Sequence, residues 1–362
     1  MELMHASRQW ASRPADQRFT SLTELHSHVQ NAHDNSRSKV MSSRQLVAAP
    51  VEGDHRALVV VGPDGAPVAP TNWSFGQLCQ RAKAPAGFLR DLPSALAADC
   101  INDGLHRRNS VEEIGILLYK NGGPAELRAA TGPNYGRVWN RTVTSALVDH
   151  FGDGLNGTFR VPGEFGKPVP VTKANTTLYA SDRDMFVFLA DEQNRIEVPN
   201  RRNGQSGQMA RGIFVWNSEV GSQTLGMAAF LFDYVCCNRI VWGAQGYQEI
   251  RIRHTSGAPD RWIEEAMPAI EAYREESTTG LVESIKQAQR KRIENVDEFL
   301  LKRFSKPQVS AIKAAHMEDE QRPIESLWDV ATGVTAYARA IQYQDQRVDL
   351  EREAGKIMKL AA

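Results

Sequence analysis

The chain changes character at Gly257, and this change limits the folds that are open to it. Residues 153–256 combine apolar runs with many glycines, whereas residues 259–362 carry helical patterns and few strand signals. Grouped strands followed by grouped helices favour an α+β protein over a doubly wound parallel sheet. We therefore expect a central, mostly antiparallel β-sheet region with helices, followed by a C-terminal helical region. The expected divisions are a polar N-terminal segment (1–40), an α+β core (41–256) and a helical part (257–362).

Three short turn signals predict hairpins in the first two thirds of the chain. GPDG at 62–65 and NGG at 121–123 each separate two apolar runs, as hairpin turns do. In MFVFLADEQNRIEV, the first six residues (185–190) read as a buried strand, DEQN as the turn and RIEV as the return strand.

Prolines and glycine place the ends of the expected helices. Residues 72–108 read as helical with breaks at Pro85 and Pro93, and VWNRTVTSALVDHF fits a helix that ends at Gly152. A weaker helical pattern begins after Thr20 or Ser21, either of which suits an N-cap.

Charge and cysteine content exclude some classes of protein. The 362 residues carry a formal net charge of zero, which argues against coating nucleic acid by bulk charge but leaves a local basic groove open. Met1–Pro14 lacks an apolar stretch, and the run Met227–Phe232 is too short to span a bilayer. With four cysteines, two of them adjacent (Cys236 and Cys237), we expect a reducing, cytoplasmic setting and no membrane partner.

Motifs for common cofactors are missing. GEFGKP at 163–168 contains Gly and Lys but has Pro168 where a phosphate-binding loop needs Ser or Thr. Neither a dinucleotide-binding G-x-G-x-x-G nor a hydrolase G-x-S-x-G is present. We therefore expect no cofactor, and an enzyme is the less favoured interpretation.

Metal ligands are also sparse. His26, His28 and His33 fit a polar helix better than a metal site, because His28 points away from the other two. Cys236 and Cys237 would face opposite sides of a strand and fit small buried residues better than ligands. Carboxylates leave one alternative open, in which Asp182, Asp184 and Glu219 hold a catalytic metal. For Asp182 and Asp184, turn and capping roles are the simpler and favoured explanation.

Basic and aromatic residues alternate in three groups. Binders of single-stranded nucleic acid need cations for the phosphates and flat rings for the bases, and the three groups supply both. The alternative is that the rings belong to the core and the arginines are merely solvated. The candidate contact residues are Arg128, Tyr135, Arg137, Trp139 and Arg141 in the first group, Arg201, Arg202 and Arg211 in the second, and Arg239, Trp242, Arg251 and Arg253 in the third.

The stretch NSEVG at 217–221 sits inside the longest apolar region. Asn217 and Ser218 are typical of a strand end, where their side chains bond to turn backbone. Glu219 lies beside an apolar run and therefore needs a partner, for which Arg211 or Arg239 are the candidates.

This same region resembles a known family. NSEVGSQTLGMAAFLFDYVCCNRIVWG is similar to the phage/plasmid-like proteins that carry domain of unknown function nine-three-two, with Asn217, Ser218, Glu219, Gly221, Cys237 and Asn238 at the family's positions. Arg239 stands where the family often has Gly. SDRDMFVFLAD, LYKNGGPAELRAATGPNYGRVWN and SLWDVATGVTAYA extend the likeness over roughly residues 70–345. The resemblance implies a phage, plasmid or integrated-element context and brings no established activity or catalytic residue.

Three functions follow as hypotheses. The favoured one is single-stranded nucleic-acid binding or annealing during recombination or replication of a mobile element, by a possible homo-oligomer. The second is a metal-dependent nuclease. The third is a scaffold or inhibitor of a host protein, with Lys286, Arg290, Lys291 and Arg292 as an interaction arm.

Overall fold

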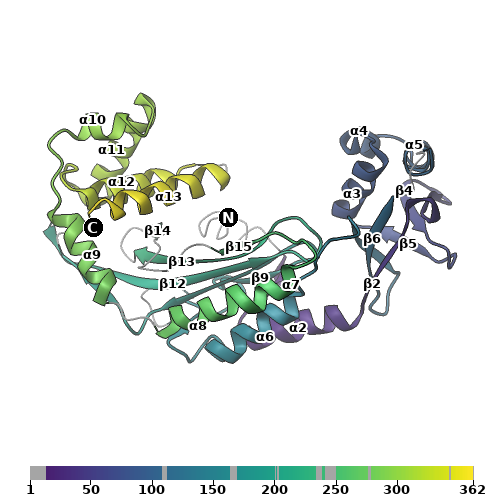
Figure 1. Cartoon of the computed structure of the whole chain (residues 1–362), viewed down its shortest axis with the longest axis horizontal. Coiled ribbons are helices and arrows are strands. Elements are labelled where there is room, and N and C mark those ends of the chain that lie inside the picture. The colour runs from purple at the N-terminus through teal and green to yellow at the C-terminus, as the bar shows by residue number, and fades with distance from the viewer. Residues whose placement is uncertain are drawn as a thin grey trace.

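A computed structural model of the chain shows a bent molecule built on two β-sheets (Figure 1). The structure describes residues 14–107, 112–163, 169–199, 201, 204–233, 239–240, 250–275, 279–341 and 344–361. The six-stranded sheet and its helices form one end of the molecule, and the C-terminal helices stand at the other. Sheets and helices combine as the sequence predicts for an α+β fold with a C-terminal helical region.

The larger sheet has nine strands in the described residues, ordered β1-β9-β10-β12-β13-β14. In addition, β8 pairs with β10, β11 with β12 and β15 with β13. All of its pairings are antiparallel. Its strands are β1 (Arg18–Phe19), β8 (Phe159–Arg160), β9 (Leu178–Ala180), β10 (Met185–Asp191), β11 (Ile196–Val198), β12 (Gly207–Asn217), β13 (Leu225–Asp233), β14 (Arg239–Ile240) and β15 (Ile250–Ile252).

The predicted hairpin at DEQN is wrong in its direction, although both of its strands exist. β10 and β11 each pair antiparallel with β12, along residues 212–217 and 207–209 respectively. The two strands therefore run the same way, and residues 192–195 form a kink between them. Asp191 stabilises this kink, since its Oδ1 accepts a hydrogen bond from Asn194 N at 3.1 Å.

Alternation along the strands gives the nine-stranded sheet two different apolar faces. One face packs into the main core with five helical elements: α2 (Leu22–Asp34), α6 (Asn140–Phe151), α7 (Ala258–Arg261), the π-helical turn η4 (Trp262–Ala266) and α8 (Met267–Glu275). The other face carries a separate aromatic cluster of Tyr179, Phe186, Phe188, Phe214 and Trp216, with Ala190 and Ala228. Every ring in this cluster is at most 5% exposed.

The C-terminal helices belong to the same core as the nine-stranded sheet. They are α9 (Thr279–Arg290), α10 (Val296–Leu301), α11 (Lys306–Glu320), α12 (Leu327–Ala338) and α13 (Gln344–Lys359). α12 is buried along almost its whole length and contacts both α11 and α13. A capping box of Ser326 and Asp329 begins α12, and Trp328 is completely buried.

The smaller sheet is mixed, in the order β2-β6-β7-β5-β4-β3, with β5 and β7 parallel. The turns predicted at GPDG and NGG are confirmed, since they join the antiparallel pairs β4–β5 and β6–β7. The strands are β2 (Ser36–Ser42), β3 (Val47–Val51), β4 (Asp54–Val61), β5 (Pro67–Pro70), β6 (Glu113–Tyr119) and β7 (Glu126–Thr131). We call this sheet and its helices the six-stranded lobe.

Three helices complete the six-stranded lobe, and prolines define their starts as predicted. They are α3 (Asn72–Ala82), α4 (Ala86–Asp91) and α5 (Ser94–His106), with Pro85 and Pro93 in the N-cap positions of the last two. Their apolar sides form a core that is separate from that of the nine-stranded sheet. α5 also covers the outer edge of β3, because the Asn102 amide bonds to both the N–H and the C=O of Ala48, at 2.7 and 2.8 Å.

Two 3-10 turns, η1 (Ala15–Gln17) and η2 (Ser43–Gln45), complete the described elements. None of the helices in the described ranges has the length and apolar character needed to cross a lipid bilayer.

Candidate functional site at the junction of the two sheets

The turn between β12 and β13 joins the two sheets. Its residues 217–222 insert beside the six-stranded lobe, where Val220 is fully buried against Leu117 and Ala129. Trp73 of α3 and Trp139, just before α6, pack around this contact. We call residues 217–222 the junction turn.

Side chains from elsewhere in the chain bind the backbone carbonyls of the junction turn. The Ser218 carbonyl accepts from Tyr135 Oη at 2.8 Å, and the Glu219 carbonyl accepts from Arg137 Nη1. The Val220 carbonyl accepts from Trp73 Nε1 at 2.9 Å and from the amide of Gln77 at 2.7 Å. Three consecutive carbonyls are thus satisfied by donors that precede the turn by about 80 to 150 positions.

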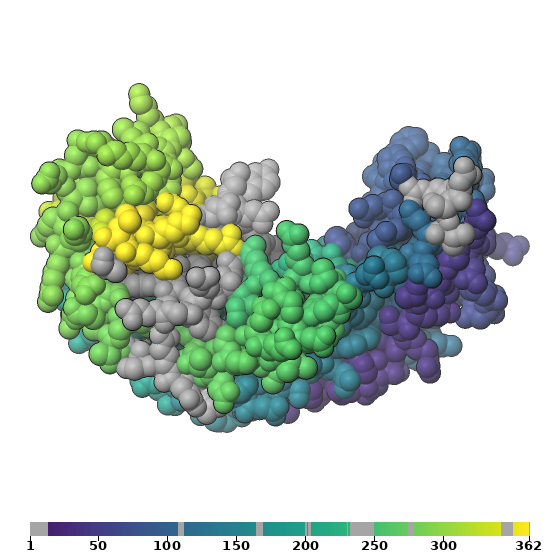
Figure 2. Space-filling model, viewed as in Figure 1, coloured from purple at the N-terminus to yellow at the C-terminus, as the bar shows by residue number. Residues whose placement is uncertain are grey.

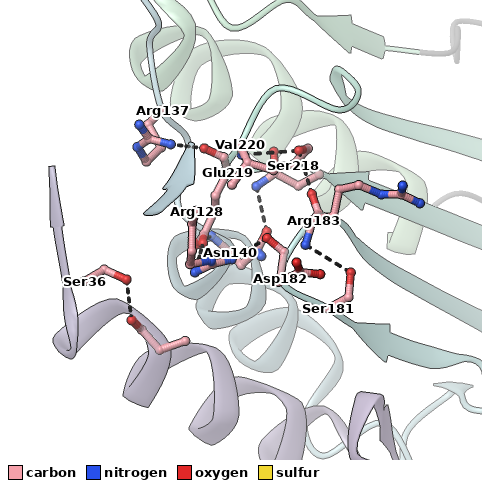
Figure 3. Close-up of polar contacts among 12 residues, drawn as sticks. Ser36, Arg128, Arg137, Asn140, Ser181, Asp182, Arg183, Ser218, Glu219 and Val220 are labelled. Atoms are coloured by element: carbon pink, nitrogen blue, oxygen red, sulfur yellow. Dashed lines mark hydrogen bonds and ion pairs between the residues drawn. The ribbon is translucent and has the colours of Figure 1, made fainter. Parts of the chain in front are cut away.

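The Glu219 carboxylate has a different partner from the two expected from sequence. Arg128 of β7 lies 3.4 Å away, and the carboxylate also accepts from the Asn140 backbone N–H at 2.8 Å (Figure 3). Asn140 is the first residue of α6, so the negative charge also lies at the positive end of a helix dipole. Arg211, one of the expected partners, instead pairs with Asp191 at 2.9 Å.

Asn217 and Ser218 act as predicted, at the end of a strand. β12 ends at Asn217, whose amide donates to the Val138 carbonyl and to Asn140 Oδ1, both at 2.8 Å. Ser218 Oγ donates to the Arg183 carbonyl at 2.7 Å. The NSE motif therefore connects the β12–β13 hairpin to residues 138–140 and to the turn before β10 at Arg183.

The alternative metal site does not form. Among the described residues, no group of three or more His, Cys, Asp or Glu side chains is placed to hold a metal ion. Glu219 is taken up by Arg128 and the start of α6. Asp184 is buried and accepts from Ser181 Oγ at 2.9 Å, whereas Asp182 is exposed. The last two are turn residues, as the simpler interpretation held.

Three of the candidate nucleic-acid contacts are buried. Arg128, Arg201 and Arg211 are 6%, 1% and 3% exposed, and each pairs with a buried carboxylate. Arg201 lies against Glu320 of α11, with its Nε 2.7 Å from the carboxylate. These guanidinium groups form ion pairs inside the protein, where a nucleic-acid strand cannot contact them.

Three further candidates lie outside the described residues or have no described side chain. Arg202 and Trp242 lie outside the described residues, as do Cys236 and Cys237, and the Arg239 side chain is not described either. Arg141 is half-buried on α6.

The structure brings the first and third basic–aromatic groups together. Tyr135 stacks on His254 with ring centroids 4.9 Å apart, and Gly136 and His254 exchange two hydrogen bonds. Gly136 has to be glycine here, because a Cβ would lie 1.8 Å from the Thr255 carbonyl oxygen. Arg251 and Arg253, which flank this contact on the β15 side, are exposed.

Arg137 and Trp139 lie beside Tyr135 and are less exposed than Arg251 and Arg253. The Arg137 guanidinium sits 5.3 Å from the centre of the Tyr135 ring and 5.6 Å from that of Trp139. Burial lowers the pKa of Arg137 and raises that of Tyr135. Burial also lowers the pKa of His254 to about 4, so the ring stacked on Tyr135 is neutral near pH 7.

Two further arginine–tryptophan pairs flank the junction turn, and of their four residues the sequence had pointed only to Arg251. Arg183 lies 5.8 Å from the Trp73 ring, and Arg251 lies 5.9 Å from the Trp216 ring. Arg183 is 41% exposed, and its side chain points away from the Glu219 cluster (Figure 3). Trp73 and Arg183 are too far apart in sequence for any local pattern to link them.

A row of residues across the nine-stranded sheet explains the position of Arg251. Register pairs Tyr179 with Phe186, Phe186 with Trp216, Trp216 with Gly226, and Gly226 with Arg251. Gly226 has no side chain, so the Trp216 indole lies over it, where a Cβ would be 1.9 Å from Cζ2. The indole therefore reaches the arginine at the end of the aromatic row.

A cavity of about 270 Å³ adjoins the buried Arg128. Its lining includes Asp16, His28 and Asp182. Burial, followed by the charge of Arg128, lowers the pKa of His28. His26 contacts Thr144 and His33 contacts Trp139, so the three histidines have separate roles on one polar helix, as predicted.

The family model for the domain of unknown function DUF932 matches residues 171–357. The chain belongs to this family. No curated protein and no solved structure matches the chain. The match covers the nine-stranded sheet from β9 onward and the C-terminal helices, and the six-stranded lobe lies outside it.

Proposed function

We propose that the chain binds single-stranded nucleic acid at the junction of its two sheets. The observation that carries this proposal is the meeting of two basic–aromatic groups more than 100 positions apart, with Tyr135 stacked on His254 beside the exposed Arg251 and Arg253. Arg183 over Trp73 adds a third cation beside the junction turn, where Trp73 binds the Val220 carbonyl.

The chemistry of these groups fits a single strand better than a duplex. Exposed guanidinium groups can neutralise phosphates, and half-buried rings can stack only on bases that are not already paired within a helix. The molecule is hollowed between the six-stranded lobe and the C-terminal helices, which offers a path for an extended strand (Figure 2).

The proposed contacts are fewer than the sequence suggested. We retain Arg251 and Arg253 with Tyr135, Arg137 and Trp139, and we add Arg183 and Trp73. Arg128, Arg201 and Arg211 are omitted because they are buried with carboxylates. The nuclease alternative has no metal-binding group of side chains within the described ranges to support it.

The setting is part of the proposal. The family resemblance suggests that the protein belongs to a mobile element. We propose that it anneals single strands during recombination or replication of that element. The two cysteines of the described residues, Cys79 and Cys100, are both free thiols, which supports a reducing cytoplasm.

Fluorescence anisotropy with labelled single- and double-stranded DNA and RNA tests the proposal. The double variant R251A/R253A should weaken single-strand binding by about tenfold or more, and should reduce the slope of log K against log salt by about one to one and a half. The matched control R290A/K291A removes two exposed cations from the end of α9 and should leave binding unchanged.

Equal loss in both double variants would mean that binding follows total charge and would contradict a site at the junction. Absence of binding to every nucleic acid would overturn the proposal altogether. Adding magnesium provides a further check, because cleavage that depends on it would instead support an enzyme.

A further inference from the structure

A second candidate site lies in the six-stranded lobe, away from the junction turn. An open cavity of about 340 Å³ is bounded by β4, β5 and the beginnings of α3 and α5. Its polar lining includes Arg56, Thr71, Asn72, Arg90 and Ser94. The nucleic-acid proposal uses none of these residues.

The charged groups of this cavity are both arginines. Arg56 and Arg90 line it, and no carboxylate does so among the described residues. Asp54 is the nearest acidic residue in sequence to Arg56, and one of its oxygens accepts from the backbone N–H groups of Arg56 and Ala57, at 2.8 and 3.1 Å. These bonds lower the pKa of Asp54 and commit its carboxylate to the β4 backbone.

Arg90 is held in place while part of its guanidinium stays available. Nε donates to Asn72 Oδ1 and Nη2 donates to the Asn72 carbonyl, both at 3.0 Å. The guanidinium lies 5.1 Å from the centre of the Phe75 ring. Because neither bond uses Nη1, this nitrogen can donate to a bound anion.

Two helix N-termini add positive potential at the same place. Thr71 and Asn72 begin the 11-residue α3, and Ser94 begins the 13-residue α5. No side chain caps the start of α5. Helix dipoles and arginines therefore act in the same direction, and both favour a negative charge in the cavity.

The remaining lining is apolar. It is contributed by Ala57, Leu58, Pro70, Phe75, Leu92 and Ala97. A ligand that fits must combine an anionic group with a flat or apolar body, because a free inorganic anion would leave this surface uncovered.

We propose that this cavity binds a phosphate monoester with a ring-shaped apolar body, such as a nucleoside monophosphate. The phosphate accepts hydrogen bonds from Arg56 and Arg90 near the starts of α3 and α5, and the ring packs against Leu58, Phe75 and Leu92. The same chemistry occurs in a free nucleotide and at the 5′-phosphorylated end of an oligonucleotide. This inference does not depend on the function proposed for the junction.

Isothermal titration calorimetry with the full chain tests this site. Adenosine monophosphate should bind, adenosine should not bind measurably, and inorganic phosphate and glucose 6-phosphate should bind more weakly. Arg56→Gln should weaken nucleotide binding by about tenfold or more. Arg56 suits this test because its side chain makes no hydrogen bond or ion pair with other described residues, whereas Arg90 also anchors Asn72.

Arg37→Gln, on the exposed surface of β2, is the matched control and should bind as the wild type does. A short oligonucleotide with and without a 5′-phosphate distinguishes the two sources. If the site binds 5′ ends, the phosphorylated oligonucleotide should bind more tightly than adenosine monophosphate. If it binds free nucleotides, adenosine monophosphate should bind more tightly. Binding of adenosine as tight as that of its monophosphate would overturn the proposal. So would unchanged binding of adenosine monophosphate in Arg56→Gln, or absence of adenosine monophosphate binding to the wild type.

If R251A/R253A binds single strands normally while Arg56→Gln loses the nucleotide, the junction proposal fails and this one stands. If instead R251A/R253A loses single-strand binding while Arg56→Gln binds the nucleotide normally, the junction proposal stands and this one fails.

Discussion

Arginines are used differently in the two parts of the molecule. In the nine-stranded sheet and its C-terminal helices, Arg201 and Arg211 are turned inward against Glu320 and Asp191. In the six-stranded lobe, Arg56 and Arg90 are exposed. Arg128, a buried arginine of that lobe, reaches out of it to Glu219 in the junction turn.

This difference shows where buried charge is tolerated. Removing an arginine and a carboxylate from water is costly, and the cost is offset only by close, well-bonded partners. The buried pairs above join segments that are distant in sequence: Arg201 and Glu320 differ by 119 positions, and Arg128 and Glu219 by 91. The six-stranded lobe has its own apolar core and uncharged hydrogen bonds such as those between Asn102 and Ala48.

Glu320→Ala should have the largest effect on stability. The substitution leaves Arg201, which is 1% exposed, without its carboxylate, and we expect a loss of about 4 kcal/mol in the free energy of unfolding. Urea denaturation followed by circular dichroism measures this. Glu325→Ala, which breaks the exposed pair with Arg292, is the control and should cost less than about 1 kcal/mol. Similar losses in the two variants would remove the basis of the comparison.

Gly226→Ala should follow, because it disturbs the aromatic row. The new Cβ would lie 1.9 Å from the Trp216 indole, which must then leave its place beneath Arg251. We expect a loss of about 2 to 3 kcal/mol from overpacking, measured by the same denaturation. Gly87→Ala in the six-stranded lobe meets nothing within 4 Å and should be neutral or slightly stabilising. A harmless Gly226→Ala would show that the indole position is not fixed.

The pH dependence of stability should also differ between the two parts. Burial lowers the pKa of His316 in α11 to about 4, below its usual value of 6.5. As the pH falls from about 6.5 towards 4, the unfolded chain therefore binds this proton first, and the folded state loses stability. His316→Gln should lose about 2 kcal/mol less than the wild type over this range. Ser310→Ala, an exposed substitution on the same helix that changes no titratable group, is the control and should keep the wild-type dependence.

Alkaline conditions should lower the stability of the six-stranded lobe. Burial raises the pKa of the Cys79 thiol in α3 to about 11, from 9.0. The unfolded chain therefore loses this proton first as the pH rises above 9, and the six-stranded lobe loses stability. Hydrogen exchange at pH 4.5, pH 7.5 and pH 10 would show whether the C-terminal helices loosen on the acid side and the six-stranded lobe on the alkaline side. Uniform loosening at both ends would contradict the comparison.

The smallest effect concerns the edge of the six-stranded sheet. Asn102→Ala removes both hydrogen bonds to the Ala48 backbone, and we expect a loss of about 1 kcal/mol. Asp99→Ala, at an exposed position on the same helix, should change stability by less than about 0.5 kcal/mol. Concentration-dependent light scattering of Asn102→Ala would also report whether the uncovered β3 edge pairs with another chain.

Local sequence signals predicted the elements well. Pro85, Pro93 and Gly152 mark helix ends, and the NGG and GPDG turns join the strand pairs expected of them. Each of these signals depends on the conformation of a few neighbouring residues, which the sequence states directly.

Long-range features could not be predicted in the same way. The return strand after DEQN continues along β12, because pairing depends on which edge of a distant strand is free. Arg211 could not be recognised as the partner of Asp191, nor Arg128 as that of Glu219, because composition does not reveal which arginines are buried. The candidate cavity at Arg56 and Arg90 was missed for the same reason, since its residues span five elements or the loops between them.

The junction turn offers its backbone, rather than its side chains, to four of the residues that hold it. Tyr135, Arg137, Trp73 and Gln77 bind carbonyl groups, which every amino acid possesses. Those contacts depend on the number of residues in the turn more than on their identity. A deletion or insertion within residues 218–222 should therefore separate the two sheets where many single substitutions would not, so that a scan of loop length would find a connection that an alanine scan overlooks.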